Sequence, residues 1–493
     1  MTLIKFNYKR LFASVLTLAI ISCSNPWDDR ENNGDSNLNV NLTEAITNTV
    51  ETSEFAKLLV ESGYDKILAA SKTYTVFAPT NAAMALVSDE ILDDPEALKQ
   101  FIGNHIALTA YSSERNQEET QIKMYSNKYL TFEGNTKIDD ANIVTANHYA
   151  KNGVFHIIDK ALVPKLNIWQ YIKSQEGVSA TSDYLLSLKA FNIYQSDSIR
   201  KALSEEIGSG YLSDSLTNSY LKNVYNLNNE KNSYTLFLME NDGYNMEVDK
   251  MKPYLIKTSN DPAIDSTAIY AKYFTLRDMA FAKKYELDEL PETLVSRFGV
   301  EVPVDKAQIV QQIHLSNGIV YIMKKVDVKL DKRLLVTKIE GEDNISHTNG
   351  PRSAIYYRQR KDPNPLLGLY NDVIVQNSGT AMFMLDYSAK DLYSTTYKVY
   401  WRAINEQTNV FSQSLRFAEG FEIINGLRTP TGLVGTINPI AVPVRSYERV
   451  LVGQITLSKA TSLNLISLTA ANNTTNGNNS LTLDYLELEP VIK

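Results

Sequence analysis

The pattern of apolar and polar residues changes once along the chain, just beyond Lys329. Before that residue, apolar side chains recur at helical spacing, as Phe55, Leu58 and Leu59 do, and helical stretches alternate with short apolar runs. After it, short β-prone runs are separated by clusters of Gly, Asn, Asp and Pro. The pattern predicts α/β segments followed by an all-β segment, and 493 residues are enough for about three domains.

Two stretches of the first segment carry the clearest local signals. In residues 73–84, a β-prone run ends at a proline, and the side chain of Thr80 or Asn81 can cap a helix that begins directly afterwards. In residues 152–164, an Asn-Gly pair predicts a tight turn, and Val154 to Ile158 reads as a buried strand. Neither stretch contains a recognisable set of catalytic residues, so both indicate a fold but not a reaction.

These signals occur a second time in the same order. Asn81 and the Asn-Gly turn at Asn152 are 71 residues apart, and the corresponding pair, Asn241 and Asn317, is 76 residues apart. Matching runs precede and follow them: 53–59 with 181–188, 74–77 with 234–237, and 152–158 with 317–323. Three matches in one order predict two copies of one fold, the second lengthened by an insertion near residues 196–232.

Residues 75–84 and 152–164 resemble the two characteristic boxes of the fasciclin domain, an extracellular α/β module of adhesion and matrix proteins that also occurs in bacteria. Asn104 and His105 fall where that family carries a Tyr-His pair, with asparagine in place of tyrosine. The resemblance implies tandem fasciclin-like domains at residues 38–166 and 167–329. The second is divergent, since its first box lacks Ala-Pro-Thr and its second lacks His and Asp.

The remaining residues, 330–493, are predicted to form a β-sandwich. Residues 481–490 and 397–403 resemble strands of jelly-roll carbohydrate-binding modules. The expected strands are 334–339, 353–357, 382–387, 395–403, 414–417, 441–444, 450–457, 463–468 and 481–488.

The N-terminus has the features of an export signal. Lys5, Lys9 and Arg10 precede an apolar run that is too short to span a membrane, which predicts a signal peptide over residues 1–22. The run ends at Cys23, the only cysteine, in a sequence that resembles the lipobox of bacterial lipoproteins. Cys23 is therefore the expected site of lipid attachment.

Residues 23–37 are polar and locally acidic, which predicts a flexible tether. An acidic patch so close to the cysteine resembles the surface-export signal of lipoproteins in Gram-negative, glycan-harvesting bacteria. We therefore expect a lipid-anchored protein of the outer membrane that faces the exterior, with a periplasm-facing anchor as the alternative.

The charge balance argues against a nucleic-acid partner. The chain has 49 basic and 57 acidic residues, and removal of three basic residues with the signal peptide leaves 46 and a net charge of −11. Such a balance repels a phosphate backbone unless a basic run overcomes it, and the sequence has no such run.

The sequence offers little support for an enzyme. None of the five histidines has metal-ligand spacing to another histidine or to the cysteine, and the common nucleophile, zinc and phosphate-binding motifs are missing. We expect no catalytic residue, no metal and no cofactor, although hydrolysis by an unrecognised pair of carboxylates stays open.

Two groups of residues are candidates for binding. His105 and His156 lie beside apolar residues and are either structural imidazoles bonded to backbone carbonyls or part of a partner-binding face. In the C-terminal region, aromatic platforms on which sugars stack and a polar edge are expected at Tyr356, Tyr370, Tyr387, Trp401 and Arg402. Arg358 and Asp386 are further polar candidates, and Trp401 has buried packing as its alternative.

The sequence thus predicts a non-catalytic surface lipoprotein that captures an extracellular ligand, most simply a glycan. Its architecture resembles the accessory lipoproteins of outer-membrane nutrient importers, which would make importer proteins its partners. The alternative is protein–protein adhesion or complex assembly through the fasciclin-like pair.

Overall fold

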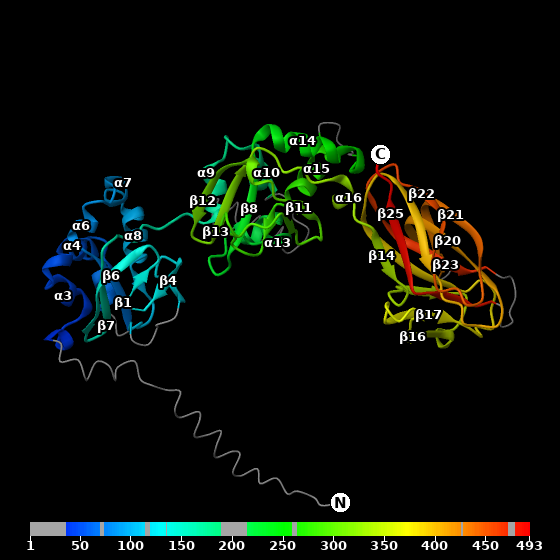
Figure 1. Ribbon diagram of the computed structural model, residues 1–493, viewed down its shortest axis with the longest axis horizontal. Coiled ribbons are helices and arrows are strands. Elements are labelled where there is room, and N and C mark those ends of the chain that lie inside the picture. The colour runs from blue at the N-terminus through cyan, green and yellow to red at the C-terminus, as the bar shows by residue number, and fades with distance from the viewer. Residues whose placement is uncertain are drawn as a thin grey trace, which may run out of the picture. The chain divides into compact units, whose positions relative to one another are not determined.

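The computed structural model describes eight stretches of the chain, and Cys23 with most of the expected tether lies outside them. They are residues 36–69, 73–113, 119–134, 136–188, 214–258, 264–424, 427–471 and 479–493. Contacts divide the chain into two compact units, one of which holds residues 1–171 with two short later segments, 227–233 and 314–318. Figure 1 shows the elements, and we describe each region by itself.

The first copy is built on a seven-stranded sheet of order β2-β1-β7-β6-β5-β4-β3. Its central strands β1 and β7 are parallel and buried along their whole length, because both are runs of apolar, β-branched and aromatic residues. This confirms both predicted strands. The strands are β1 (Tyr74–Pro79), β2 (Ile106–Ala107), β3 (Thr120–Lys123), β4 (Tyr129–Glu133), β5 (Lys137–Ile138), β6 (Ala141–Ala150) and β7 (Gly153–Ile158).

Short helices pack beside this sheet, and their apolar faces meet one side of β1 and β7 in one core. They are α3 (Leu42–Thr47), α4 (Ser53–Glu61), α5 (Tyr64–Leu68), α6 (Asn81–Met84), α7 (Asp89–Leu92) and α8 (Pro95–Gly103).

Thr80 is the residue that caps α6, since its hydroxyl accepts a hydrogen bond of 3.2 Å from the Ala83 amide. Asn81 has a different task. Its side-chain oxygen accepts from the Glu54 amide at 3.0 Å and its nitrogen donates to the Val50 carbonyl at 2.9 Å. Asn81 thereby supplies the cap that α4 does not obtain from its own N-cap residue.

Asn152 acts in the same way on α3. Its side-chain oxygen accepts from the Leu42 amide at 2.8 Å, and its nitrogen donates to the Leu68 carbonyl. The neighbouring Gly153 is required by close approach, because a Cβ there would lie 2.2 Å from the Tyr74 carbonyl oxygen. The Asn-Gly pair is thus explained by packing at the start of β7.

The second copy has a four-stranded sheet of order β12-β13-β8-β9, which matches β6-β7-β1-β2 of the first copy. Its strands are β8 (Tyr234–Met239), β9 (Ala280–Phe281), β12 (Ile309–Leu315) and β13 (Gly318–Met323), with β10 (Thr293–Val295) and β11 (Glu301–Pro303) as a separate pair. Its helices are α9 (Ile168–Ser174), α10 (Ala180–Ser187), α12 (Asp214–Thr217), α13 (Ser219–Asn223), α14 (Asn241–Met251) and α15 (Ser266–Leu276).

The repeat is visible in individual hydrogen bonds. Asn241 accepts from the Ala180 amide at 2.9 Å at the start of α10, as Asn81 does at the start of α4. Asn317 accepts from the Ile168 amide at 2.9 Å, as Asn152 does from Leu42.

A threonine bridge recurs as well. Thr75 donates to the Thr109 carbonyl and accepts from the Tyr111 amide. Thr235 makes the same two bonds, to Lys283 and Tyr285. Part of the predicted insertion, residues 196–213, lies outside the described residues.

The C-terminal region consists of three sheets, of orders β14-β25-β19-β22, β15-β18-β23-β20-β21 and β16-β17-β24. It follows a short helix, α16 (Leu330–Arg333), so the predicted strand at 334–339 begins later than expected. The strands are β14 (Thr337–Glu340), β15 (Ser346–Thr348), β16 (Ile355–Lys361), β17 (Leu369–Val375), β18 (Met384–Leu392), β19 (Thr396–Arg402), β20 (Phe411–Ile424), β21 (Leu427–Val442), β22 (Arg449–Thr456), β23 (Thr461–Ala470), β24 (Leu481–Leu483) and β25 (Tyr485–Pro490).

The sequence reading missed β15, β17 and most of β21. The sequence of β17 contains Asn371-Asp372, which resembles a turn, but Asp372 is buried in the strand because Arg358 of β16 neutralises it. Strand β21 contains two prolines, which it tolerates because it lies at the edge of its sheet. In the described part of the chain, no helix is long and apolar enough to cross a membrane.

Arg333 joins α16 to the second copy. Its Nη2 lies 3.0 Å from Glu247 and its Nη1 lies 3.5 Å from Asp278, and all three side chains are buried. On the other side, the Tyr393 hydroxyl donates to the Arg333 carbonyl at 3.0 Å. The C-terminal region therefore shares a buried ionic cluster with the second copy within one compact unit.

Candidate functional site

His105 is part of the interior of the first copy. Its ring is fully buried, with Nδ1 2.8 Å from the Phe101 carbonyl and Nε2 accepting a 2.9 Å hydrogen bond from the Leu162 amide. Burial lowers the pKa of this imidazole to about 4, against an opposing hydrogen bond to Phe101. The side chain is a neutral structural group and forms no part of a surface.

His156 on β7 is equally buried. Its Nε2 lies 3.0 Å from the Tyr111 carbonyl, its Nδ1 accepts from the Asn147 amide, and its ring stacks on Phe77. Burial lowers its pKa to about 4 as well. The predicted partner-binding face is therefore not formed by these two side chains, because both imidazoles are satisfied by backbone groups inside the fold.

Asp159, which directly follows β7, is a paired carboxylate. It accepts hydrogen bonds of 2.8 Å from both the backbone and the side-chain nitrogen of Asn142. In the ranges that the structure describes, no three His, Cys, Asp or Glu side chains are grouped so that they could hold a metal ion.

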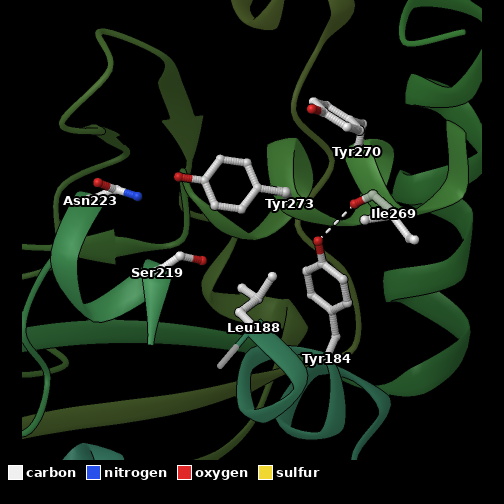
Figure 2. A pocket seen from close by; sticks show the side chains of 7 residues that line it. All are labelled: Tyr184, Leu188, Ser219, Asn223, Ile269, Tyr270 and Tyr273. Carbon is white, nitrogen blue, oxygen red and sulfur yellow. Dashed lines mark hydrogen bonds between the residues drawn. The ribbon is translucent and has the colours of Figure 1, made fainter. Parts of the chain in front are cut away.

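The second copy carries a small pocket that the sequence did not indicate (Figure 2). Tyr184 on α10 and Tyr270 and Tyr273 on α15 surround a space of about 190 Å³, with α13 on the opposite side. The Tyr184 hydroxyl donates to the Ile269 carbonyl at 2.7 Å, which fixes its ring at the wall. The result is a mainly apolar pocket lined by aromatic rings.

Four of the five predicted ligand residues in the C-terminal region are buried, all except Tyr356. Trp401 is only 2% exposed, and it shares the buried face of β19 with Tyr397 and Val399. Tyr387 is fully buried, and its hydroxyl donates to the Gly341 carbonyl at 2.9 Å. Neither ring can stack on a ligand, so the prediction for Tyr387 is wrong, and for Trp401 the alternative of buried packing holds.

Asp386, a further polar candidate, is buried too and accepts hydrogen bonds from Ser346 and Ser467. Both of its carboxylate oxygens are hydrogen-bonded inside the sheet, so Asp386 cannot contact a ligand.

Arg402 and Tyr370 border one surface depression of about 480 Å³, which we call the Arg402 depression. The guanidinium of Arg402 donates to Asp484 at 2.6 Å, to Asp362, and to the Tyr447 carbonyl at 2.7 Å. Each of its three nitrogens therefore already has an acceptor within the protein. Acidic Glu340 and Glu342, basic Lys338 and exposed leucines complete the wall.

The Tyr370 ring lies 5.1 Å from the Arg402 guanidinium, and its buried hydroxyl has no hydrogen-bond partner among the described residues. Burial raises the pKa of this phenol to about 12, so it remains a neutral donor. Tyr370 and Arg402 are thus brought together, Tyr370 by β17 and Arg402 by β19.

Tyr356 borders a second depression of about 380 Å³, which we call the Tyr356 depression. Tyr356, Arg358 and Arg360 alternate along β16 and therefore lie on one face of the strand. Tyr356 is 45% exposed and pairs with Ile374 of β17. An exposed ring on an apolar neighbour beside two guanidinium groups is suited to hold a flat ligand.

The opposite wall of the Tyr356 depression is the segment that follows β19. Asn405 holds this segment by donating to the carbonyls of Asn409 and Val442 and accepting from the Gln407 amide. Glu406 then reaches Arg358 at 3.7 Å and Arg360 at 3.5 Å.

Gln407 lines the Tyr356 depression with a side chain that the fold holds in place. Its Oε1 accepts a 3.0 Å hydrogen bond from Ser480, which sets the orientation of the amide. Its buried Nε2 has no acceptor among the described residues. The amide is thus held in one orientation at the wall of the depression.

Sequence reasoning found Tyr356 and Arg358 but missed Arg360, Glu406 and Gln407. The alternation of side chains along β16 places Arg360 on the same face as Tyr356 and Arg358, so the sequence could have identified it. The segment at 405–407 carries no signal of its own, because only the fold places it against β16.

Comparison with known proteins identifies the first region. Residues 50–164 match the sequence model of the fasciclin domain. This part of the chain is a fasciclin domain. It contains both boxes, together with the two buried histidines of this chain, and it is followed by a β-rich region, as the sequence predicted for the fold class.

Two curated relatives match over part of their length. The transforming growth factor-beta-induced protein ig-h3 of Oryctolagus cuniculus is 31% identical over 159 residues, which are 30% of this chain and 22% of that protein. Protein sll1483 of Synechocystis is 28% identical over 108 residues, 20% of this chain and 59% of that protein. The chain thus spans less than two thirds of either relative.

Among solved structures, the fasciclin-domain pair of the insect cell adhesion molecule Fasciclin I aligns with 58% of this chain and 99% of its own, at 16% identity and a TM-score of 0.24. A β-1,3-glucan-binding module of Bacillus halodurans aligns with 31% of this chain and 95% of its own, at 11% identity and a TM-score of 0.19.

Proposed function

We propose that this protein is a non-catalytic, lipid-anchored surface protein that captures a glycan in the Tyr356 depression. The observation that carries the proposal is the exposed Tyr356 ring beside planar, hydrogen-bonding side chains that are held in place by the fold. Sugars present an apolar face to an aromatic ring and hydroxyl groups around their edge, and the Tyr356 depression offers partners for both. The fasciclin domain and the second copy would then act as a spacer and docking surface.

Replacement of Tyr356 by alanine is the direct test of the stacking surface. We expect the variant Tyr356→Ala to bind its glycan about tenfold more weakly or worse, because an aromatic platform at the centre of a site carries much of the binding energy. Affinity electrophoresis in gels that contain single polysaccharides measures the change. Tyr125→Ala is the matched control, since Tyr125 is also partly exposed but lies in the first copy.

If every polysaccharide retards wild type and Tyr356→Ala equally, binding does not use the Tyr356 depression. If none retards the wild type, the glycan hypothesis loses its support.

The cellular role that fits this site is that of an accessory to an outer-membrane nutrient importer, with importer proteins as partners. The anchor would be Cys23 and the ligand site would face the exterior. We expect Cys23→Ser to move the protein from the detergent phase to the soluble fraction after export in a Gram-negative host. Protease treatment of intact cells should digest the wild type, whereas full protection would contradict the outward orientation.

A second candidate function is protein–protein adhesion or complex assembly through the fasciclin-like pair. The observation that favours it is the tyrosine-lined pocket of the second copy, which could receive an apolar side chain of a partner. In that case, membrane proteins that co-purify with the wild type in detergent should be lost from the double variant Tyr270→Ala and Tyr273→Ala, while glycan binding stays unchanged.

A further inference from the structure

The Tyr356 depression contains two arginines and yet has no free positive charge. Arg358 donates through Nε to Asp372 at 2.9 Å and through Nη2 to the other oxygen of the same carboxylate. This two-pronged pair is rigid and partly buried, because Asp372 has no exposed surface. The charge of Arg358 is therefore already neutralised within the strand pair β16–β17.

Arg360 is the arginine that could serve an anionic ligand, because half of its side chain is exposed. Its nearest carboxylate is Glu406, at 3.5 Å, and the same carboxylate lies 3.7 Å from Arg358. Two guanidinium groups thus face two carboxylates, Asp372 and Glu406, and the charges balance. Without Glu406 the depression would hold one excess positive charge beside the Tyr356 ring.

The neighbouring Arg402 depression has an excess of negative charge. Its wall contains four carboxylates, of Glu340, Glu342, Asp362 and Asp484, against the two cations Lys338 and Arg402. An anionic chain that extended from one depression toward the other along β16–β17 would meet an excess of negative charge. One Glu342 oxygen in this wall is buried and has no hydrogen-bond partner within the described part of the chain.

From these contacts we infer that Glu406 is a specificity-determining residue, which makes the Tyr356 depression select neutral sugars and reject uronic acids. The inference rests on the proposed glycan-binding function and names its substrate class. A neutral sugar can accept from Arg360 and donate to Glu406 without breaking an ion pair. A uronate carboxylate would have to displace Glu406 from Arg360 and would leave both anions in one depression.

The test compares neutral hexasaccharides (cello-, xylo-, laminari- and mannohexaose) with hexagalacturonate by isothermal titration, on the chain from Ser24 onward. We expect the wild type to bind a neutral hexasaccharide at least about tenfold more tightly than the uronate. In Glu406→Gln, which keeps the shape and removes the charge, that ratio should fall by about tenfold or more. Glu419→Gln is the matched control, because Glu419 is equally exposed (31% against 30%) and pairs with Lys459 away from both depressions.

The outcomes separate the inference from the function on which it rests. If the wild type binds hexagalacturonate as tightly as the neutral sugars and Tyr356→Ala abolishes both, the inference is wrong and the proposed function stands. The inference is also overturned if Glu406→Gln leaves the ratio unchanged or changes it no more than Glu419→Gln does. If no hexasaccharide binds, or if Tyr356→Ala binds as the wild type does, the proposed function fails and the inference with it.

Discussion

Acidification from pH 7 to pH 5 is expected to destabilise the fasciclin domain through its two buried histidines. Both imidazoles have a pKa of about 4 in the folded protein, against an ordinary value of 6.5 in the unfolded chain. The unfolded state therefore binds more protons between these values, so that stability is full above pH 6.5 and is lost as the pH falls toward 4. At pH 5 the expected loss is about 2 kcal/mol for each histidine.

Urea titration followed by pulse proteolysis measures this loss, with the surviving peptides of residues 74–158 quantified by mass spectrometry. Carboxylates also titrate in this range, so the control is the double variant His105→Gln and His156→Gln. Glutamine retains one donor and one acceptor, although its lower stability at pH 7 is expected. If the histidines are responsible, the free energy of unfolding should change much less between pH 7 and pH 5 in this variant than in the wild type. An identical change in both proteins would show that they are not.

Replacement of Arg333 by methionine is expected to destabilise the second copy together with the C-terminal region by about 3 kcal/mol, because Glu247 and Asp278 would stay buried with only Lys250 (2.6 Å) and Arg277 (4.0 Å) to offset their charges. Burial already raises the pKa of the Asp278 carboxyl. The free energy of unfolding, measured by urea titration at pH 7 on the chain from Ser24 onward, reports the loss.

Two variants make this prediction specific. Lys332→Met removes the neighbouring cation, whose ion pair with Glu301 is exposed, and should change stability little. The triple variant Arg333→Met, Glu247→Gln and Asp278→Asn removes both buried charges and should regain much of the loss. A triple variant as unstable as Arg333→Met alone would show that packing, and not buried charge, is responsible.

The sequence predicted best what depends on local chemistry. Strands β1 and β7 were predictable because both are short, mainly apolar and β-prone runs, and a cap at Thr80 or Asn81 was expected from the proline before them. The repeat was predictable because Asn81 and Asn152 each make helix-fixing bonds that Asn241 and Asn317 reproduce. These residues act on neighbours that the fold itself requires. The domain boundaries drawn from the repeat stay predictions.

The ligand site was harder to predict because it depends on which face of a strand is covered. Alternation places Tyr397, Val399 and Trp401 on one face of β19 and Tyr400 on the other, but it does not say which face is inside. The structure buries the Trp401 face, whereas Tyr400 packs against the guanidinium of Arg449 at 3.4 Å. Glu406 and Gln407 could not be found at all, since they face β16 only through the bonds of Asn405.

A crystal structure of the chain from Ser24 onward with a bound neutral oligosaccharide is the most direct test of glycan capture in the Tyr356 depression. We expect a sugar ring against Tyr356, with ring hydroxyls within hydrogen-bond distance of Arg360 and Glu406. A sugar bound elsewhere on the chain, with the Tyr356 depression unchanged at saturating ligand, would contradict it.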